Sequence, residues 1–85
     1  MKKHTKIFFE SRGISPGDYV ECEIPGCGAE CVDIHHIKAR GMGGSKHRDN
    51  RNNLIGLCRS CHDMYGDSKG HRDWLRNIVK NMRIN

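Results

Sequence analysis

The sequence NLIGLCRSCH, residues 53–62, joins a short apolar run to two cysteines and a histidine. Leu54–Leu57 has the length and composition of a short strand. Gly56 lies inside it, where a glycine weakens a strand or marks the close approach of another group. Cys58 and Cys61 have the CxxC spacing of a metal-binding knuckle. The segment therefore predicts a strand that leads directly into a metal site.

A second strand is predicted upstream, in the sequence VDIHHI at residues 32–37. Its β-branched residues alternate with polar ones, as they do in a strand with two different faces. His35 and His36 are neighbours in this strand, so their side chains are expected to point to opposite faces. The long basic segment between the two strands, residues 38–53, is expected to form the loop of a hairpin.

A second cysteine knuckle precedes this strand. Cys22 and Cys27 enclose Pro25 and Gly26, a pair that favours a turn. Two cysteine pairs about 30 residues apart are typical of a closed, tetrahedral Zn²⁺ site. The predicted ligands of this structural zinc are Cys22, Cys27, Cys58 and Cys61. Cys31 is an alternative partner of Cys27 and can replace Cys22 in the set.

The composition limits how large a core the chain can form. Only 35% of its 85 residues are hydrophobic, so a disulfide, a metal or a partner is expected to supplement the core of a small α+β fold. Five cysteines and six histidines make a metal the first candidate. We predict a single domain over residues 1–85, with an N-terminal helix over about 4–12. A short strand is expected over 19–23, a helix over 58–65, and a C-terminal amphipathic helix over about 68–82. The apolar face of the last helix should pack onto the core.

The net charge of +5 is concentrated in one part of the chain. Between Ile34 and His62 there are six basic residues and a single acidic one, and the remainder is balanced. A basic segment in a neutral frame indicates a polyanionic partner, although a solvated loop has the same composition. The apolar run Ile7–Phe9 is too short for a signal peptide or a membrane span. We therefore expect a cytoplasmic protein with reduced cysteines and no membrane partner.

These motifs together resemble one enzyme family. Asp33-Ile-His-His-Ile, then Asn53, then Cys58-x-x-Cys-His62 is similar to the HNH endonuclease family over about residues 22–66. The resemblance implies a ββα-metal core, also called a His-Me finger, with flanking N- and C-terminal helices. The chain as a whole resembles the short proteins that phages and prophages encode, which work in the cytoplasm of a bacterium or an infected host.

The resemblance also implies a role for each polar residue of the motif. His36 would be the general base, and His35 and His62 would bind a catalytic divalent ion. That ion would be Mg²⁺, Mn²⁺ or another transition ion, since imidazole ligands suit the softer metals. Asn53 would orient the loop through hydrogen bonds to the backbone. Imidazole titrates near neutrality, which suits a histidine to take a proton from water.

The activity implied by the resemblance is hydrolysis of phosphodiester bonds in DNA, with low sequence specificity and products carrying 5′-phosphate and 3′-hydroxyl ends. Basic side chains near the motif are candidate contacts to the DNA phosphates. These candidates are Arg40, Lys46, Arg48, Arg51 and Arg59. His4 and His71 lie outside the motif and are expected to be ordinary surface residues.

Other interpretations stay open on the sequence alone. A non-catalytic zinc module that binds nucleic acid needs the cysteines and the basic segment but not the histidines. An accessory subunit of a phage DNA-packaging or recombination machine would work with a partner such as a terminase. Thiol–disulfide exchange would need reactive free thiols. His62 can also be a spare zinc ligand, and His35 and His36 a structural pair. Both a monomer and a homodimer fit the sequence.

Overall fold

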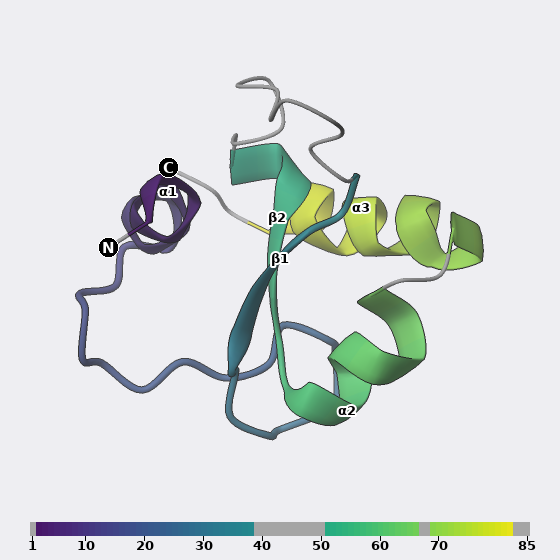
Figure 1. Cartoon of the computed structure of the whole chain (residues 1–85), viewed down its shortest axis with the longest axis horizontal. Helices are drawn as coiled ribbons and strands as arrows, with labels where there is room; N and C mark the ends of the chain where they lie inside the picture. The colour runs from purple at the N-terminus through teal and green to yellow at the C-terminus, as the bar shows by residue number, and fades with distance from the viewer. Residues whose placement is uncertain (1, 39–50, 67–68, 83–85) are drawn as a thin grey trace.

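The computed structural model describes residues 2–38, 51–66 and 69–82, which form a small α+β arrangement (Figure 1). A two-stranded sheet stands between helix α1 and helix α3. The main elements are α1 (Lys3–Arg12), β1 (Asp33–His36), β2 (Leu54–Leu57), α2 (Arg59–Cys61) and α3 (Arg72–Asn81). Single helical turns join them within the described ranges: η2 (Arg51–Asn53), η3 (His62–Gly66) and η4 (Lys69–His71).

The two strands form an antiparallel hairpin with different neighbours on its two faces. β1 and β2 pair along their whole length, with His35 opposite Ile55. Side chains of successive strand residues alternate between the faces. His36 accordingly points toward α1, and His35 points toward η3 on the other side. The hairpin thus presents its two histidines to separate surroundings.

The core lies on the face of the hairpin that α3 covers. Leu75 and Val79 of α3 are fully buried and belong to one cluster with Ile55, Leu57 and the cysteine knuckles. These two α3 residues are four positions apart and therefore lie on one side of the helix. Full burial of such a side chain contributes about 1.5–3 kcal/mol. The predicted apolar face therefore holds α3 on the sheet.

A buried ion pair fastens α1 to the hairpin. The Arg12 guanidinium donates to both carboxylate oxygens of Glu23, at 2.8 and 3.0 Å, and to the backbone oxygen of Leu54 at 2.7 Å. Glu23 also accepts a hydrogen bond from the backbone N–H of Gly56 at 2.9 Å. The Arg12 and Glu23 side chains are only 8% and 12% exposed. Three segments, namely α1, the first cysteine knuckle and β2, meet in this network.

Replacing Arg12 with methionine is expected to lower the free energy of unfolding by about 3–5 kcal/mol, because Glu23 becomes a buried charge without its partner. Adding Glu23→Gln to that variant should recover part of the loss. Lys6→Ala, an exposed position on the same helix, should change stability by less than about 0.5 kcal/mol. Chemical unfolding measures all three variants, and equal losses for Arg12→Met and Lys6→Ala would contradict the structural role of the ion pair.

Several elements differ from the sequence-based expectation. Residues 19–23 form no strand and make an isolated bridge, Glu21 to Glu30, because most of their backbone hydrogen bonds close the cysteine knuckle. A single bond, from the N–H of Glu23 to the oxygen of Gly56, reaches β2. The expected helix over 58–65 begins as α2 and continues as η3, a wider π-helical turn that ends at Gly66. The C-terminal helix proper starts at Arg72, after η4. Among the residues described, no helix is both long and apolar enough to cross a membrane.

Candidate active site and metal centres

Four thiols converge where the two cysteine knuckles meet. The sulfur atoms of Cys22, Cys27, Cys58 and Cys61 all lie within 4.8 Å of one another, and all four are free cysteines. Cys27 Sγ is 3.7 Å from Cys58 Sγ and 3.7 Å from Cys61 Sγ. Zinc–sulfur bonds of about 2.3 Å in a tetrahedron require sulfur atoms about 3.8 Å apart. The donor set and its spacing therefore fit a structural zinc ion.

The thiols of this cluster differ in how readily they lose a proton. The backbone N–H of Cys61 donates to Cys58 Sγ at 3.4 Å, and this hydrogen bond lowers the pKa of Cys58 to about 7. Burial raises the pKa of Cys22 and the pKa of Cys61. Since a metal binds thiolates, its binding must release the protons that the buried thiols hold. Acid is therefore expected to weaken metal binding at this cluster.

Cys31 lies apart from the four-thiol cluster. Its Sγ donates to the backbone oxygen of Asp33 at 3.5 Å, and burial raises the pKa of Cys31 to about 11. A β-carbon at position 56 would lie only 2.8 Å from Cys31 Sγ and 3.0 Å from Phe8 Cζ. Gly56 therefore marks a close approach of both side chains to the strand. Of the two alternatives for the fourth thiol, the geometry favours Cys22.

His35 and His62 come from different elements and face each other. Their ring centroids are 5.0 Å apart, with the ring planes inclined by 62°. Asp33 Oδ2 lies 3.3 Å from His62 Nδ1. This is an ion-pair distance and not a hydrogen bond, and it places a carboxylate beside one ring nitrogen of His62, the kind of neighbour that orients a metal-binding histidine. The chemistry of this donor set fits a divalent transition ion with open positions.

Asn53 extends the hairpin by one step beyond the last strand pair. Its side chain accepts a hydrogen bond from the backbone N–H of Lys38 at 2.9 Å and donates to the Lys38 oxygen at 3.0 Å. The backbone oxygen of Asn53 accepts from the N–H of Ile37 at 2.8 Å. The residue is only 6% exposed. These bonds fix the backbone just after His36.

His36 occupies the opposite face of the hairpin from His35, beside α1. Its ring lies against the ring of His4, with centroids 4.7 Å apart and planes inclined by 57°. The expectation that His4 is an ordinary surface residue was wrong, because α1 folds back over the sheet. No spacing in the sequence indicates this contact. His71 also differs from the expectation, since its ring packs against Tyr65 and Trp74.

The candidate phosphate contacts are only partly described by the structure. Arg51 in η2 and Arg59 in α2 are exposed. Arg59 Nη1 lies 3.4 Å from Asp33 Oδ2, on the same side as the His35–His62 pair. The other three candidates, Arg40, Lys46 and Arg48, lie outside the described residues.

Gly66 provides the space that the His62 ring occupies. A β-carbon at Gly66 would lie 2.5 Å from His62 Cδ2 and 3.2 Å from His62 Nε2. Gly66→Ala is therefore expected to displace the ring and weaken divalent-ion binding at His35 and His62 by roughly 10- to 100-fold. Titration of the zinc-loaded protein with Mn²⁺ measures this change. Met64→Ala, at an exposed position in the same turn, is the matched control, and equal affinities in the two variants would refute the prediction.

A comparison with models of protein families matches residues 20–68 to the family described as HNH endonuclease. The match covers more than half of the 85-residue chain and includes both cysteine pairs, both strands and His62. Searches of curated proteins and of solved structures give no match. The matched segment contains the hairpin, the four-thiol cluster and the facing histidines in the order given above. The chain therefore belongs to the HNH endonuclease family.

Proposed function

We propose that this protein is a metal-dependent endonuclease that hydrolyses phosphodiester bonds in DNA, and that its hairpin and following helical turns are a ββα-metal core. The observation that carries the proposal is the facing pair of His35 and His62, with the Asp33 carboxylate 3.3 Å from Nδ1 of His62. His36 follows His35 directly, and the hydrogen bonds of Asn53 hold the backbone beside it. A ligand pair and a proton acceptor thus occupy neighbouring positions.

In the proposed reaction, His36 accepts a proton from a water molecule. The oxygen of that water attacks phosphorus, and the bond from phosphorus to the 3′ oxygen breaks. The 3′ oxygen takes a proton from solvent, so the products carry 5′-phosphate and 3′-hydroxyl ends. A divalent ion held by His35 and His62 would supply positive charge to the phosphate oxygens and the leaving oxygen. His35 and His36 point to opposite faces of the hairpin, so the proposal requires the phosphate to lie at the edge of β1, where side chains from both faces can approach it.

The four-thiol cluster has a positioning role in this proposal. Cys61 directly precedes His62, and Cys58 directly follows β2. A zinc ion bound there would fix the turn that carries His62 relative to the strand that carries His35. The zinc takes no part in the chemistry, because four thiolates close its coordination sphere. We also propose that Arg40, Lys46, Arg48, Arg51 and Arg59 contact DNA phosphates, which position the strand without selecting its sequence.

Cleavage of supercoiled plasmid by the zinc-loaded protein tests the proposed function. We expect nicking with added Mg²⁺, Mn²⁺, Co²⁺ or Ni²⁺ and none with EDTA at a concentration that leaves the structural zinc bound. His62→Ala purified in parallel should need a higher ion concentration or lose activity. End-labelling before and after phosphatase treatment should reveal 5′-phosphate termini. Binding of DNA without cleavage in any of these ions would refute the proposal and favour a non-catalytic zinc module.

A further inference from the structure

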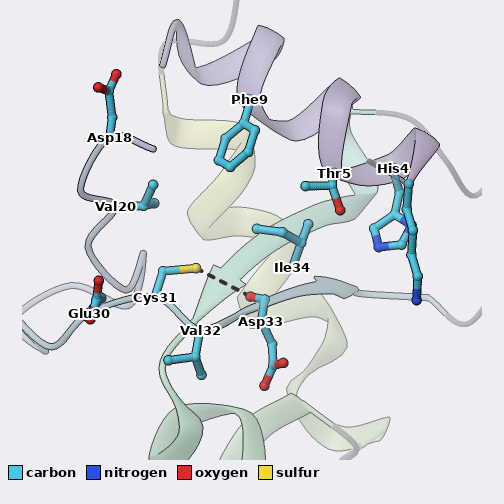
Figure 2. A pocket seen from close by; sticks show the side chains of 11 residues that line it. His4, Thr5, Phe9, Asp18, Val20, Glu30, Cys31, Val32, Asp33 and Ile34 are labelled. Carbon is cyan, nitrogen blue, oxygen red and sulfur yellow. Dashed lines mark hydrogen bonds between the residues drawn. The ribbon is translucent and has the colours of Figure 1, made fainter. Parts of the chain in front are cut away.

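A pocket of about 460 Å³ opens between α1 and β1, on the His36 face of the hairpin (Figure 2). Its size lies in the range of small-ligand sites. Phe9 projects from α1 toward Val20 and Ile34, and Cys31 approaches from below (Figure 2). These four side chains are only half-buried, so the pocket has an apolar floor that no other described residue fills.

The pocket adjoins the proposed general base. Ile34 lines it and lies two residues before His36 on the same face of β1, a separation of about 6.6 Å along a strand. His4 also lines the pocket, and its ring contacts the ring of His36. A group bound in the pocket would therefore lie beside the phosphate on which His36 is proposed to act.

The polar residues that line the pocket differ between its two ends. His4, whose ring contacts the ring of His36, lies at one end, and the carboxylates of Asp18 and Glu30 lie at the other (Figure 2). Lys2, directly before α1, and Asp33 of β1 also line the pocket. A nucleotide has a complementary pattern, since it joins an anionic phosphate to a flat, weakly polar base whose edge carries N–H donors. The base would lie over the apolar floor, with its donors toward the carboxylates and its phosphate toward Lys2.

We propose that this pocket is a nucleobase subsite that holds the base next to the cleaved phosphate, out of the DNA stack, against the ring of Phe9. The inference rests on the proposed nuclease function and adds a substrate class to it. DNA with an unpaired nucleotide at the cut would be preferred over perfect duplex, because the unpaired base enters the pocket without the cost of unstacking and unpairing. An aromatic side chain stacks on any base, so the subsite accepts bases of different sequence.

A cleavage experiment with two changes, one in the DNA and one in the protein, tests the subsite. The substrate is a duplex with one bulged nucleotide beside the cut, and its matched version has an abasic nucleotide at that position. Removal of the base should lower kcat/KM of the wild type roughly 5- to 100-fold. In Phe9→Ala the same removal should have almost no effect, because the stacking partner is already gone. Equal losses in wild type and Phe9→Ala would overturn the proposal.

Two further variants separate stacking from folding. Phe9→Leu keeps an apolar side chain against the hairpin but has no aromatic face, so it should behave like Phe9→Ala in the base-removal comparison while keeping thermal stability close to wild type. Tyr19→Ala removes an aromatic ring that is 63% exposed and does not line the pocket. It should respond to base removal as the wild type does. A response like that of Phe9→Ala would contradict the assignment of the subsite to Phe9.

A binding measurement keeps the test independent of catalysis. A DNA trinucleotide is titrated into the zinc-loaded protein without added divalent ion, and methyl resonances are followed by NMR. The methyl groups of Val20 and Ile34 should shift, and those of Ile55, buried on the other face, should not. Absence of these shifts overturns the subsite. If the wild type cleaves none of the DNA substrates, the nuclease function is refuted. The titration shows in that case too whether the pocket binds a nucleotide.

Discussion

Cys61→Ser is expected to unfold the chain under conditions in which the wild type is folded. The four thiols are placed for a tetrahedral zinc ion, and structural zinc contributes about 10–16 kcal/mol of binding energy in small domains. This is as large as the whole stability of a typical domain, about 5–15 kcal/mol. The core of this chain is small, and three of its buried residues are cysteines of the four-thiol cluster. Loss of the ion should therefore remove most of the folding free energy.

Circular dichroism and zinc analysis measure this outcome. The wild type should contain one zinc per chain and lose its cooperative thermal transition when a strong chelator removes the ion. Cys31→Ser is the matched control, because it alters a thiol that lies outside the cluster. It should keep both the zinc and the transition. A folded Cys61→Ser variant with an unchanged midpoint would show that the cluster does not stabilise the chain.

His36→Ala is expected to lower kcat for DNA cleavage by about 10²- to 10⁴-fold, the usual contribution of a general base. The substitution removes a half-buried ring on the α1 face and leaves the four-thiol cluster and the His35–His62 pair unchanged. Zinc content and affinity for added Mn²⁺ should therefore stay unchanged. This combination distinguishes loss of a proton acceptor from loss of a ligand, since His35→Ala and His62→Ala should both weaken Mn²⁺ binding.

His71→Ala is the control variant, because it removes a histidine to which no catalytic role is assigned. His71 packs against Tyr65 and Trp74 and lies outside the proposed catalytic residues, so its variant should retain cleavage. Single-turnover cleavage of a labelled duplex at saturating Mn²⁺ compares the two variants. Wild-type rates in purified His36→Ala would rule out His36 as the base and move the search to other groups beside the hairpin.

The pattern of residues along the chain predicted both strands of the hairpin, the N-terminal helix and the cysteine turns. Strand β2 coincides with the apolar run Leu54–Leu57, as the composition of that run predicted. The two cysteines of each pair lie at the ends of a tight turn, so their spacing in the sequence limits the distance between their sulfur atoms. Alternation along a strand also predicted that His35 and His36 point to opposite faces. The extent of the strand over 19–23 was wrong, because nothing local distinguishes a sheet partner from the other side of a turn.

Local order and spacing thus determined the hairpin, the two cysteine knuckles and the identity of the motif histidines. Only tertiary packing decided that Cys22 joins the four-thiol cluster in place of Cys31, that Asp33 lies against His62, and that α1 brings His4 and Phe9 to the face carrying His36. Strand alternation and turn geometry depend on residues that are close together in the sequence, so they can be predicted from it. The packing of α1 against the sheet involves instead a buried ion pair between residues 12 and 23 and the close approach of Phe8 to Gly56. Such contacts exist only once distant segments have been brought together.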